Sequence, residues 1–584
     1  MKKFLKIFRQ PELYIVVLLV ACILAGLLLR VKVENVVLQR GESVEEVSLP
    51  ITKKMRSGEF FQVELDIKNP YRSSYDMRVV PDDCAESIVV NGKALEMEHI
   101  QNRCDFSKGF LLEDSVLAPN RVGDRTHYSF FLKNNGGDAG LNLFIYQTSF
   151  LTKASNFAAV VLFALLCLLL ARRFKLRGGL LLLFFVGVVF RTVFFANVPY
   201  TTYSNDVDGH VAYVQYILEK HAVPGVDDCW TCYHPPVYYA TAAPSFVLGE
   251  SLGVTGPTGL QAFSLLLSVA TLLLGILFLR GFLTGAPLGV ASLLWTFWPL
   301  MILVSPRIGN DQMFYMVHVL SLWGGANYLK EGRGRYLIVA VIAAALAMWT
   351  KTTGIVTLGT LVLFALCGYA KNGRVFWPKK SEVIAWGLLL LLIAGIALQK
   401  LLGDADLVGN ASGLNGKLRV GNEAFNYIFF DLKSFVTHPY TSAWNEDWGR
   451  EFFWNYSFKS AMFGEFELVR TQTGRTLATL MSVSFLGLMV YAVRGFWKTK
   501  LAAVHWILLL QTVAFFAALM FLRIKVPFSC SNDFRYIAPA LLGIIPFVGY
   551  GIHVENGSLK WRVLGYGFVI GFVVSTVILY ILAM

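Results

Sequence analysis

Two carboxylates lie in a short polar stretch within an otherwise apolar part of the chain. The stretch reads Ser204-Asn205-Asp206-Val207-Asp208-Gly209-His210 and follows an apolar run long enough for a membrane helix. An acidic side chain beside hydrocarbon is energetically costly, so Asp206 and Asp208 are candidates for function. A carboxylate at hydrogen-bond distance from a hydroxyl group can accept its proton. The alternative is structural, because either residue could cap a helix over residues 209–220.

Five more polar or aromatic side chains are candidates for binding a substrate. A second motif of the same loop reads Tyr233-His234-Pro235-Pro236-Val237-Tyr238-Tyr239, and Asn310-Asp311 opens a later helix. The candidates are His210, His234, Tyr238, Asn310 and Asp311. His234 and Asn310-Asp311 could shape a polar pocket or hold a divalent ion, but one histidine with scattered carboxylates does not predict a metal site. For at least one of these residues, structural hydrogen bonding is the favoured role.

Four cations are expected at the same interface as the acidic loop. Arg191 lies near the outer end of its helix, and the others belong to the segments Ser305–Asp311, Trp349–Gly354 and Cys530–Tyr536. Single cations at such places often contact lipid phosphates or extend toward water. That alternative explains less well why Arg307 and Arg535 accompany Asn-Asp pairs. Fixed cations in a low-dielectric site stabilise negative charge, so Arg191, Arg307, Lys351 and Arg535 are candidates for binding an anionic group.

The cysteines indicate disulfides on the outer side. Cys229-Trp230-Thr231-Cys232 has the spacing of a redox motif, but no strand–helix–strand context surrounds it. A local disulfide or pairing with Cys530 is therefore expected. Cys84 and Cys104 form the second candidate pair in a segment that is exported on this interpretation.

The elements that position these residues are predicted to be membrane helices. The chain has 584 residues, of which 55% are hydrophobic and 16% charged, and its apolar runs predict about thirteen transmembrane helices. Basic residues gather in alternate short loops, such as Arg172 to Arg177 and Lys330 to Arg335. By the positive-inside rule these loops are cytoplasmic and the N-terminus is inside. The net charge of +13 therefore reflects topology, and membrane lipids rather than nucleic acid are the expected partners.

Polarity divides the chain into five expected parts. Residues 31–150 are polar with alternating runs and an Asn91-Gly92 hairpin turn, which predicts an extracytoplasmic all-β domain. Its motifs Asp82-Asp83-Cys84 and Val90-Asn91-Gly92-Lys93 resemble those of the jelly-roll domains that bind sugars. Sugar binding and a spacer role both stay open. The first apolar run has no small-residue cleavage site after it, so it is interpreted as an anchor. The parts are an anchor over 1–30, the β domain over 31–150, a transmembrane core over 151–401 with a first outer loop over 197–260, a second outer segment over 402–475, and transmembrane helices over 476–584.

The acidic loop, His234-Pro235-Pro236-Val237-Tyr238-Tyr239, Asn310-Asp311 and Thr350-Lys351-Thr352-Thr353-Gly354 together resemble the GT-C glycosyltransferases. More narrowly, the segment over about residues 180–400 is similar to bacterial relatives of dolichyl-phosphate-mannose protein mannosyltransferases and lipid A aminoarabinose transferases. The resemblance implies that Asp206, four residues before His210, is the catalytic base or orients the acceptor. Asp208 is the second candidate, because this chain has Asp-Val-Asp where the family commonly has an Asp-Glu pair.

The resemblance implies an inverting transfer of a monosaccharide from an undecaprenyl-phosphate carrier to a surface glycan, lipid or protein outside a bacterial plasma membrane. One base and no enzymatic nucleophile suffice for such a single displacement. The four cations Arg191, Arg307, Lys351 and Arg535 would then form the cradle for the departing lipid phosphate. An oligosaccharyltransferase or ligase that uses a pyrophosphate carrier is an alternative, although the chain lacks the Trp-Trp-Asp-Tyr-Gly motif. A transporter or flippase is another alternative. Transporters usually carry charge at mid-membrane and have repeated, broken helices, whereas the charged residues of this chain cluster at the outer helix ends and no inverted repeat is visible in its sequence.

Overall fold

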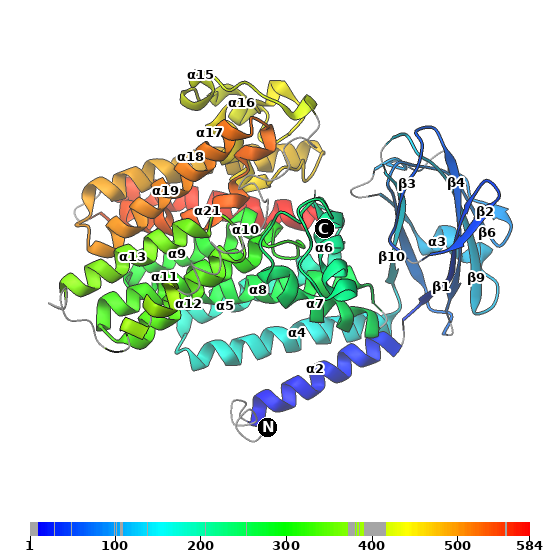
Figure 1. Ribbon diagram of the computed structural model, residues 1–584, viewed down its shortest axis with the longest axis horizontal. Coiled ribbons are helices and arrows are strands. Elements are labelled where there is room, and N and C mark those ends of the chain that lie inside the picture. The colour runs from blue at the N-terminus through cyan, green and yellow to red at the C-terminus, as the bar shows by residue number, and fades with distance from the viewer. Residues whose placement is uncertain are drawn as a thin grey trace. The chain divides into compact units, whose positions relative to one another are not determined.

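The computed structural model describes residues 10–584 except 29, 48, 70, 98–99, 101, 106–108, 137, 205, 253, 372–379, 381, 385, 391–415 and 555–557. The chain forms two compact units (Figure 1). One comprises Met1–Leu169 with Ser251–Thr255, and the other comprises Leu170–Glu250 with Gly256–Met584.

The first unit contains a helix, a β-sandwich and most of a second helix. Helix α2 (Gln10–Leu28) precedes the strands and α4 (Phe150–Arg173) follows them, and Ser155 Oγ on α4 donates to the Cys22 carbonyl at 2.7 Å. The strands are β1 (Lys32–Arg40), β2 (Ser43–Glu46), β3 (Ile51–Lys54), β4 (Phe60–Lys68), β5 (Tyr75–Pro81), β6 (Cys84–Val90), β7 (Lys93–Ala94), β8 (Phe110–Leu112), β9 (Arg125–Lys133) and β10 (Asp138–Gln147). Cys84 forms a disulfide with Cys104.

The β-sandwich consists of two antiparallel sheets (Figure 1). Their inner faces share one core. The strand orders are β2-β1-β4-β9-β6-β7 and β3-β10-β5-β8. In β4 the residues Phe61, Val63, Leu65 and Ile67 alternate inward, as the period of a half-buried strand requires. Asn91 and Gly92, both with positive φ, form the turn between β6 and β7, as the sequence predicts.

The second unit is helical. Its helices before the second outer segment are α5 (Gly178–Asn197), α6 (Val207–Lys220), α7 (Val237–Ser251), α8 (Gly256–Leu279), α9 (Gly285–Phe297), α10 (Pro299–Leu303), α11 (Asp311–Glu331), α12 (Gly334–Met348) and α13 (Gly354–Lys371). The later elements are α15 (Ala424–Ile428), α16 (Leu432–Thr437), η4 (Glu446–Trp448), α17 (Phe453–Phe463), α18 (Gln472–Lys498), α19 (Ala503–Lys525), η5 (Ser529–Asn532), η6 (Phe534–Gly543), α20 (Ile545–Ile552) and α21 (Leu559–Ala583).

The chain is a multi-pass membrane protein with fewer long apolar helices than the sequence predicts. Among the described residues, seven helices are long and apolar enough to cross a membrane, and the pair η5–η6 with α20, bent by 46°, makes an eighth. The prediction of about thirteen is therefore not reached. Helix α9 ends before Pro299, since proline cannot donate a backbone hydrogen bond. Helix α12 has 15 residues, and the last part of the transmembrane core expected over 151–401 lies outside the described residues from 391 onward.

Helix α11 packs against four other elements of the second unit and carries the site at its start. These elements are α8, α12, α13 and η6, and Phe314, Val317 and Leu322 of α11 are buried. Because α11 is held on several sides, the turn before Asp311 has a defined position relative to η6. That turn and η6 supply the two guanidinium groups of the site.

Candidate active site

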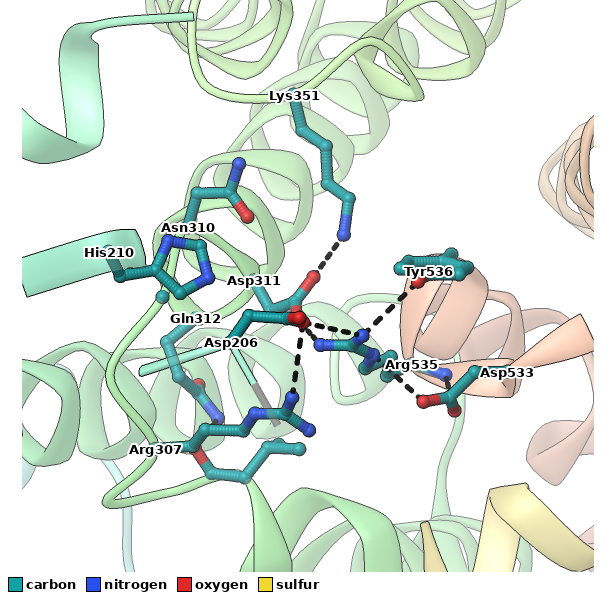
Figure 2. Close-up of polar contacts among 12 residues, drawn as sticks. Asp206, His210, Arg307, Asn310, Asp311, Gln312, Lys351, Asp533, Arg535 and Tyr536 are labelled. Atoms are coloured by element: carbon teal, nitrogen blue, oxygen red, sulfur yellow. Dashed lines mark hydrogen bonds and ion pairs between the residues drawn. The ribbon is translucent and has the colours of Figure 1, made fainter. Parts of the chain in front are cut away.

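Asp206 lies at the start of α6, and its side chain does not cap the helix. Its carboxylate makes no capping hydrogen bond but instead faces two guanidinium groups (Figure 2). Arg535 Nη2 donates to Oδ2 at 3.2 Å, and Arg307 Nη2 lies 3.8 Å from the same oxygen. Trp230 Nε1 donates to Oδ1 at 3.3 Å. The carboxylate is thus contacted by three segments that are far apart in the sequence.

A second ion pair joins the start of α11 to the turn after α12. Lys351 Nζ donates directly to Asp311 Oδ1. Next to this pair, Asn310 Nδ2 donates to the Thr350 carbonyl at 3.1 Å, which fixes the two motifs against each other. Asp311 Oδ2 also lies 3.8 Å from Arg535 Nη1, so the two ion pairs meet at Arg535 (Figure 2).

Arg535 is held by further groups of its own segment. Asp533 Oδ2 lies 2.8 Å from its Nε, and Nη2 donates to the Tyr536 hydroxyl at 3.1 Å. The side chains of Arg535 and Asp533 are 7% and 1% exposed, whereas that of Asp206 is 27% exposed. Asp206 is therefore the carboxylate of this cluster that a substrate reaches most easily.

The surroundings keep Asp206 ionised and the nearby histidines neutral. Burial by itself raises the pKa of Asp206, but Arg535 and Arg307 outweigh it, and the net pKa lies well below the usual range. Burial lowers the pKa of His210 to about 4, and burial and then His210 lower the pKa of His234 well below its usual value. The arginines and Lys351, rather than the stacked histidine rings, are therefore the cations of the site.

Three of the predicted substrate-binding residues, His210, His234 and Tyr238, form hydrogen bonds with segments around the cluster. His210 Nδ1 lies 2.8 Å from the Tyr239 hydroxyl, and the Tyr238 hydroxyl accepts from the Gly309 N–H at 3.1 Å. The His234 carbonyl accepts from the Tyr213 hydroxyl at 3.1 Å. The Tyr238 contact holds the turn that carries Arg307 and Asp311, whereas the other two join α6 to the segment that contains His234 and Tyr239.

Two predicted residues are placed differently from the others. Arg191 is buried in α5, where its guanidinium donates to the Thr296 carbonyl at 3.0 Å, the Gly187 carbonyl at 3.2 Å and Ser268 Oγ at 3.3 Å. It thus connects α5, α8 and α9 instead of joining the cradle, because its helix turns it into the packed interior. Asp208 is exposed in the first turn of α6, whereas Asp206 meets the guanidiniums.

The sequence interpretation missed three residues that contact or face the site. Trp230 and Asp533 belong to quoted motifs without an assigned role. Glu465 is half-buried and accepts from the Tyr456 hydroxyl at 2.5 Å. Burial, followed by Asp533, raises the pKa of Glu465 to about 7. The sequence feature that could have identified Glu465 is the position of an acidic residue between Phe463 and Phe466.

No metal-binding cluster is evident in the part of the chain that the structure describes. There, no group of three or more His, Cys, Asp or Glu side chains could hold an ion.

Comparison with known families gives a match within the helical unit. Residues 233–397 match the family model described as dolichyl-phosphate-mannose-protein mannosyltransferase. The resemblance to the GT-C glycosyltransferases is confirmed. The matched segment contains Arg307, Asp311 and Lys351, while Asp206 and Arg535 lie on either side of it. No curated protein matches the chain.

Two solved structures show distant likeness. The oligosaccharyltransferase of Archaeoglobus fulgidus in its apo form is 11% identical, with a TM-score of 0.39 over 69% of this chain and 55% of that one. The present chain therefore spans about half the length of that protein. ArnT from Cupriavidus metallidurans bound to undecaprenyl phosphate is 12% identical, with a TM-score of 0.31 over 64% of this chain and 77% of that one.

Proposed function

We propose that the chain is an inverting glycosyltransferase that moves a monosaccharide from a polyprenyl-phosphate carrier to a glycan, lipid or protein acceptor. The active site faces the outer side of a bacterial plasma membrane, with undecaprenyl phosphate as the carrier and the N-terminus in the cytoplasm. The carboxylate of Asp206, shared between Arg307 and Arg535, carries this proposal. The family match supports a lipid-phosphate sugar as the donor class.

The geometry supports a single displacement. The acceptor oxygen attacks the anomeric carbon while the bond from that carbon to the phosphate oxygen breaks, and the bonding electrons leave with the phosphate. Asp206 orients the acceptor hydroxyl and receives its proton as the displacement proceeds. It is ionised before the reaction, because two guanidiniums hold its pKa low. No covalent enzyme intermediate is needed, so the configuration at the anomeric carbon inverts.

The same cations stabilise the leaving phosphate. Charge-assisted hydrogen bonds from arginine to a phosphate are strong, and a low-dielectric site increases their effect. Among the described residues, Arg307 Nη2 has no hydrogen-bond partner although it is buried. Its Asp206 contact at 3.8 Å is longer than a hydrogen bond. Arg307 is therefore the group best prepared to bind the donor phosphate, with Lys351 and Arg535 next to it.

The decisive experiment compares two neighbouring carboxylates. Purified Asp206→Asn is expected to lose transfer from a synthetic polyprenyl-phosphate sugar by roughly 10³-fold or more, since both the proton acceptor and its charge are removed. Asp208→Asn is the matched control and is expected to retain most of the activity. Product is measured by mass spectrometry, and correct insertion by size-exclusion chromatography of the detergent-solubilised protein. Undiminished turnover by Asp206→Asn would remove the proposed base.

Donor competition distinguishes the proposal from the pyrophosphate-dependent alternative. A lipid monophosphate sugar is expected to be consumed with formation of a glycosylated acceptor and free lipid monophosphate. Consumption of only a lipid pyrophosphate glycan would favour an oligosaccharyltransferase. Movement of labelled lipid across a vesicle bilayer without any glycosylated product would favour a flippase.

A further inference from the structure

An exposed tryptophan contacts the candidate catalytic carboxylate. The side chain of Trp230 is 43% exposed, yet its indole N–H donates to Asp206 Oδ1 at 3.3 Å. The guanidiniums of Arg535 and Arg307 face the other oxygen, Oδ2. One oxygen therefore has a neutral donor and the other faces two cations, which fixes the orientation of the carboxylate plane.

The segment that carries Trp230 is a closed loop. Cys229 and Cys232 form a disulfide around Trp230 and Thr231, and Cys232 and Thr231 are buried while Trp230 is not. The loop thus has a buried base and an exposed ring. A closed loop of this size restricts the backbone positions from which the indole reaches Asp206.

The loop packs directly against the first turn of α6. A Cβ atom on Gly209 would lie 2.7 Å from Thr231 Cγ2 and 3.2 Å from Trp230 Cβ. This approach is closer than an ordinary side chain allows, so the glycine lets the loop and the start of α6 touch. The position of Asp206, three residues before Gly209, is thereby tied to the disulfide loop.

We propose that Trp230 is a positioning residue that aligns Asp206 for transfer, and that the Cys229–Cys232 disulfide makes this alignment dependent on an oxidised loop. This proposal rests on the proposed function, because it assigns Asp206 the role of proton acceptor. Breaking the disulfide with a dithiol yields two thiols while the reagent becomes a cyclic disulfide. Trp230 then loses its fixed backbone and Asp206 loses the donor on Oδ1.

The charged and titratable groups that face Asp206 determine the sign of the expected pH effect. They are Arg307 from the turn before α11, Arg535 from η6, His210 from α6 and Tyr233 from the loop after the disulfide. All of these remain when Trp230 becomes phenylalanine. The indole N–H favours the ionised carboxylate, so its removal raises the pKa of Asp206. Because the ionised form is active, the acid limb of the pH profile moves to higher pH.

The first test separates the N–H group from the aromatic ring. Trp230→Phe keeps a ring in the loop and is expected to lower kcat roughly tenfold with little change in KM, as for a group acting on the transition state. Its acid limb shifts upward. Trp497→Phe is the matched control, because Trp497 is 74% exposed at the end of α18. That variant is expected to behave as the unmodified protein.

The second test addresses the disulfide. The double variant Cys229→Ser/Cys232→Ser is expected to show the same loss in kcat and the same pH shift as Trp230→Phe, and to be insensitive to dithiothreitol. Dithiothreitol lowers kcat of the unmodified protein to the same level. The double variant Cys84→Ser/Cys104→Ser removes the disulfide of the β-sandwich and is expected to retain the response to dithiothreitol. Non-reducing peptide mapping verifies each redox state.

The outcomes distinguish this proposal from the proposed function. If Trp230→Phe and Cys229→Ser/Cys232→Ser keep kcat and the acid limb while Asp206→Asn is inactive, the positioning proposal is overturned and the function stands. If Asp206→Asn is active, the proposed function fails, and the positioning proposal fails with it. A large rise in KM without a pH shift for Trp230→Phe would also overturn positioning, because it would indicate direct substrate binding.

Discussion

At the scale of single residues, the two arginines of the site have different surroundings. Arg535 contacts Asp206, Asp311, Asp533 and the Tyr536 hydroxyl. Of these three carboxylates, only that of Asp206 forms an ion pair with Arg307, at 3.8 Å. Among the described residues Arg307 also has a buried Nη2 without a hydrogen-bond partner. The contacts therefore assign Arg535 mainly to structure and Arg307 mainly to the substrate.

This difference predicts that alanine substitution of Arg535 mainly lowers stability, whereas alanine substitution of Arg307 mainly lowers activity. Arg535→Ala leaves the buried Asp533 without its ion-pair partner and removes one of the two cations at Asp206 and at Asp311. We therefore expect a loss of about 3–5 kcal/mol in the free energy of unfolding. Arg307→Ala keeps Arg535 beside Asp206, so we expect nearly normal stability but roughly 10²-fold lower kcat/KM. Thermal unfolding in detergent and kinetics with the lipid-phosphate donor measure the two effects.

A lysine variant provides the control. Arg307→Lys keeps the charge but loses the planar pair of donors that matches a phosphate, so its activity is expected between those of the unmodified protein and Arg307→Ala. Equal losses of stability in Arg307→Ala and Arg535→Ala would contradict the division of roles.

At the scale of elements, the turn between α10 and α11 depends on Gly309. Its φ of +153° is rarely adopted by residues with a side chain, and a Cβ would lie 3.1 Å from His210 Nε2. The Gly309 N–H donates to the Tyr238 hydroxyl. The turn is therefore held between α6 and α7, and it presents Arg307 on one side of Gly309 and Asp311 on the other.

We expect Gly309→Ala to disturb the site strongly, although the substitution adds only one methyl group. The added methyl group strains the backbone by about 1–3 kcal/mol and pushes against His210, which moves Arg307 and Asp311 relative to Asp206. Activity is therefore expected to fall at least tenfold, measured as kcat/KM. Gly289→Ala on α9 is the control, because nothing lies within 4 Å of its Cβ position. Equal activity of the two variants would exclude this role of the turn.

At the scale of the helical unit, the site and the basic loops lie at opposite ends of the same helices. Helix α11 begins with Asp311 at the site and ends near Lys330 after 21 residues, a rise of about 30 Å. Helix α12 starts beside Arg333 and ends next to Lys351. Helix α19 starts after Lys500 and leads toward Arg535. One end of these helices thus carries the cluster, and the other carries the basic loops.

The positive-inside rule then predicts which end faces the cytoplasm. An epitope inserted at residues 223–227, where Val223 is 53% exposed, is expected to be reached by antibody in intact spheroplasts. An epitope inserted at residues 499–501 is expected to be reached only after permeabilisation. The reverse pattern would place Asp206 in the cytoplasm and contradict a donor presented on the outer face.

Much of the candidate site was predictable from the sequence, because polar residues at helix ends in an apolar chain are visible locally. Asp206, Arg307, Asp311, Lys351 and Arg535 were all found in this way, and the structure brings them together. Arg191 has the same local signal, but its helix turns it toward the Thr296 carbonyl. Nothing in the local sequence distinguishes Trp230 from other tryptophans in surface loops, and only its position in the tertiary structure relates it to Asp206.

The fold shows the same division between local and non-local information. Hydropathy, strand alternation and turn residues are properties of short segments, so the sequence alone determined that the chain is a membrane protein with a β domain near its start. Which charges neutralise one another is not local, since Arg535 and Asp206 are 329 residues apart. Their meeting depends on how α6, α11 and η6 pack, and only the tertiary structure decided it.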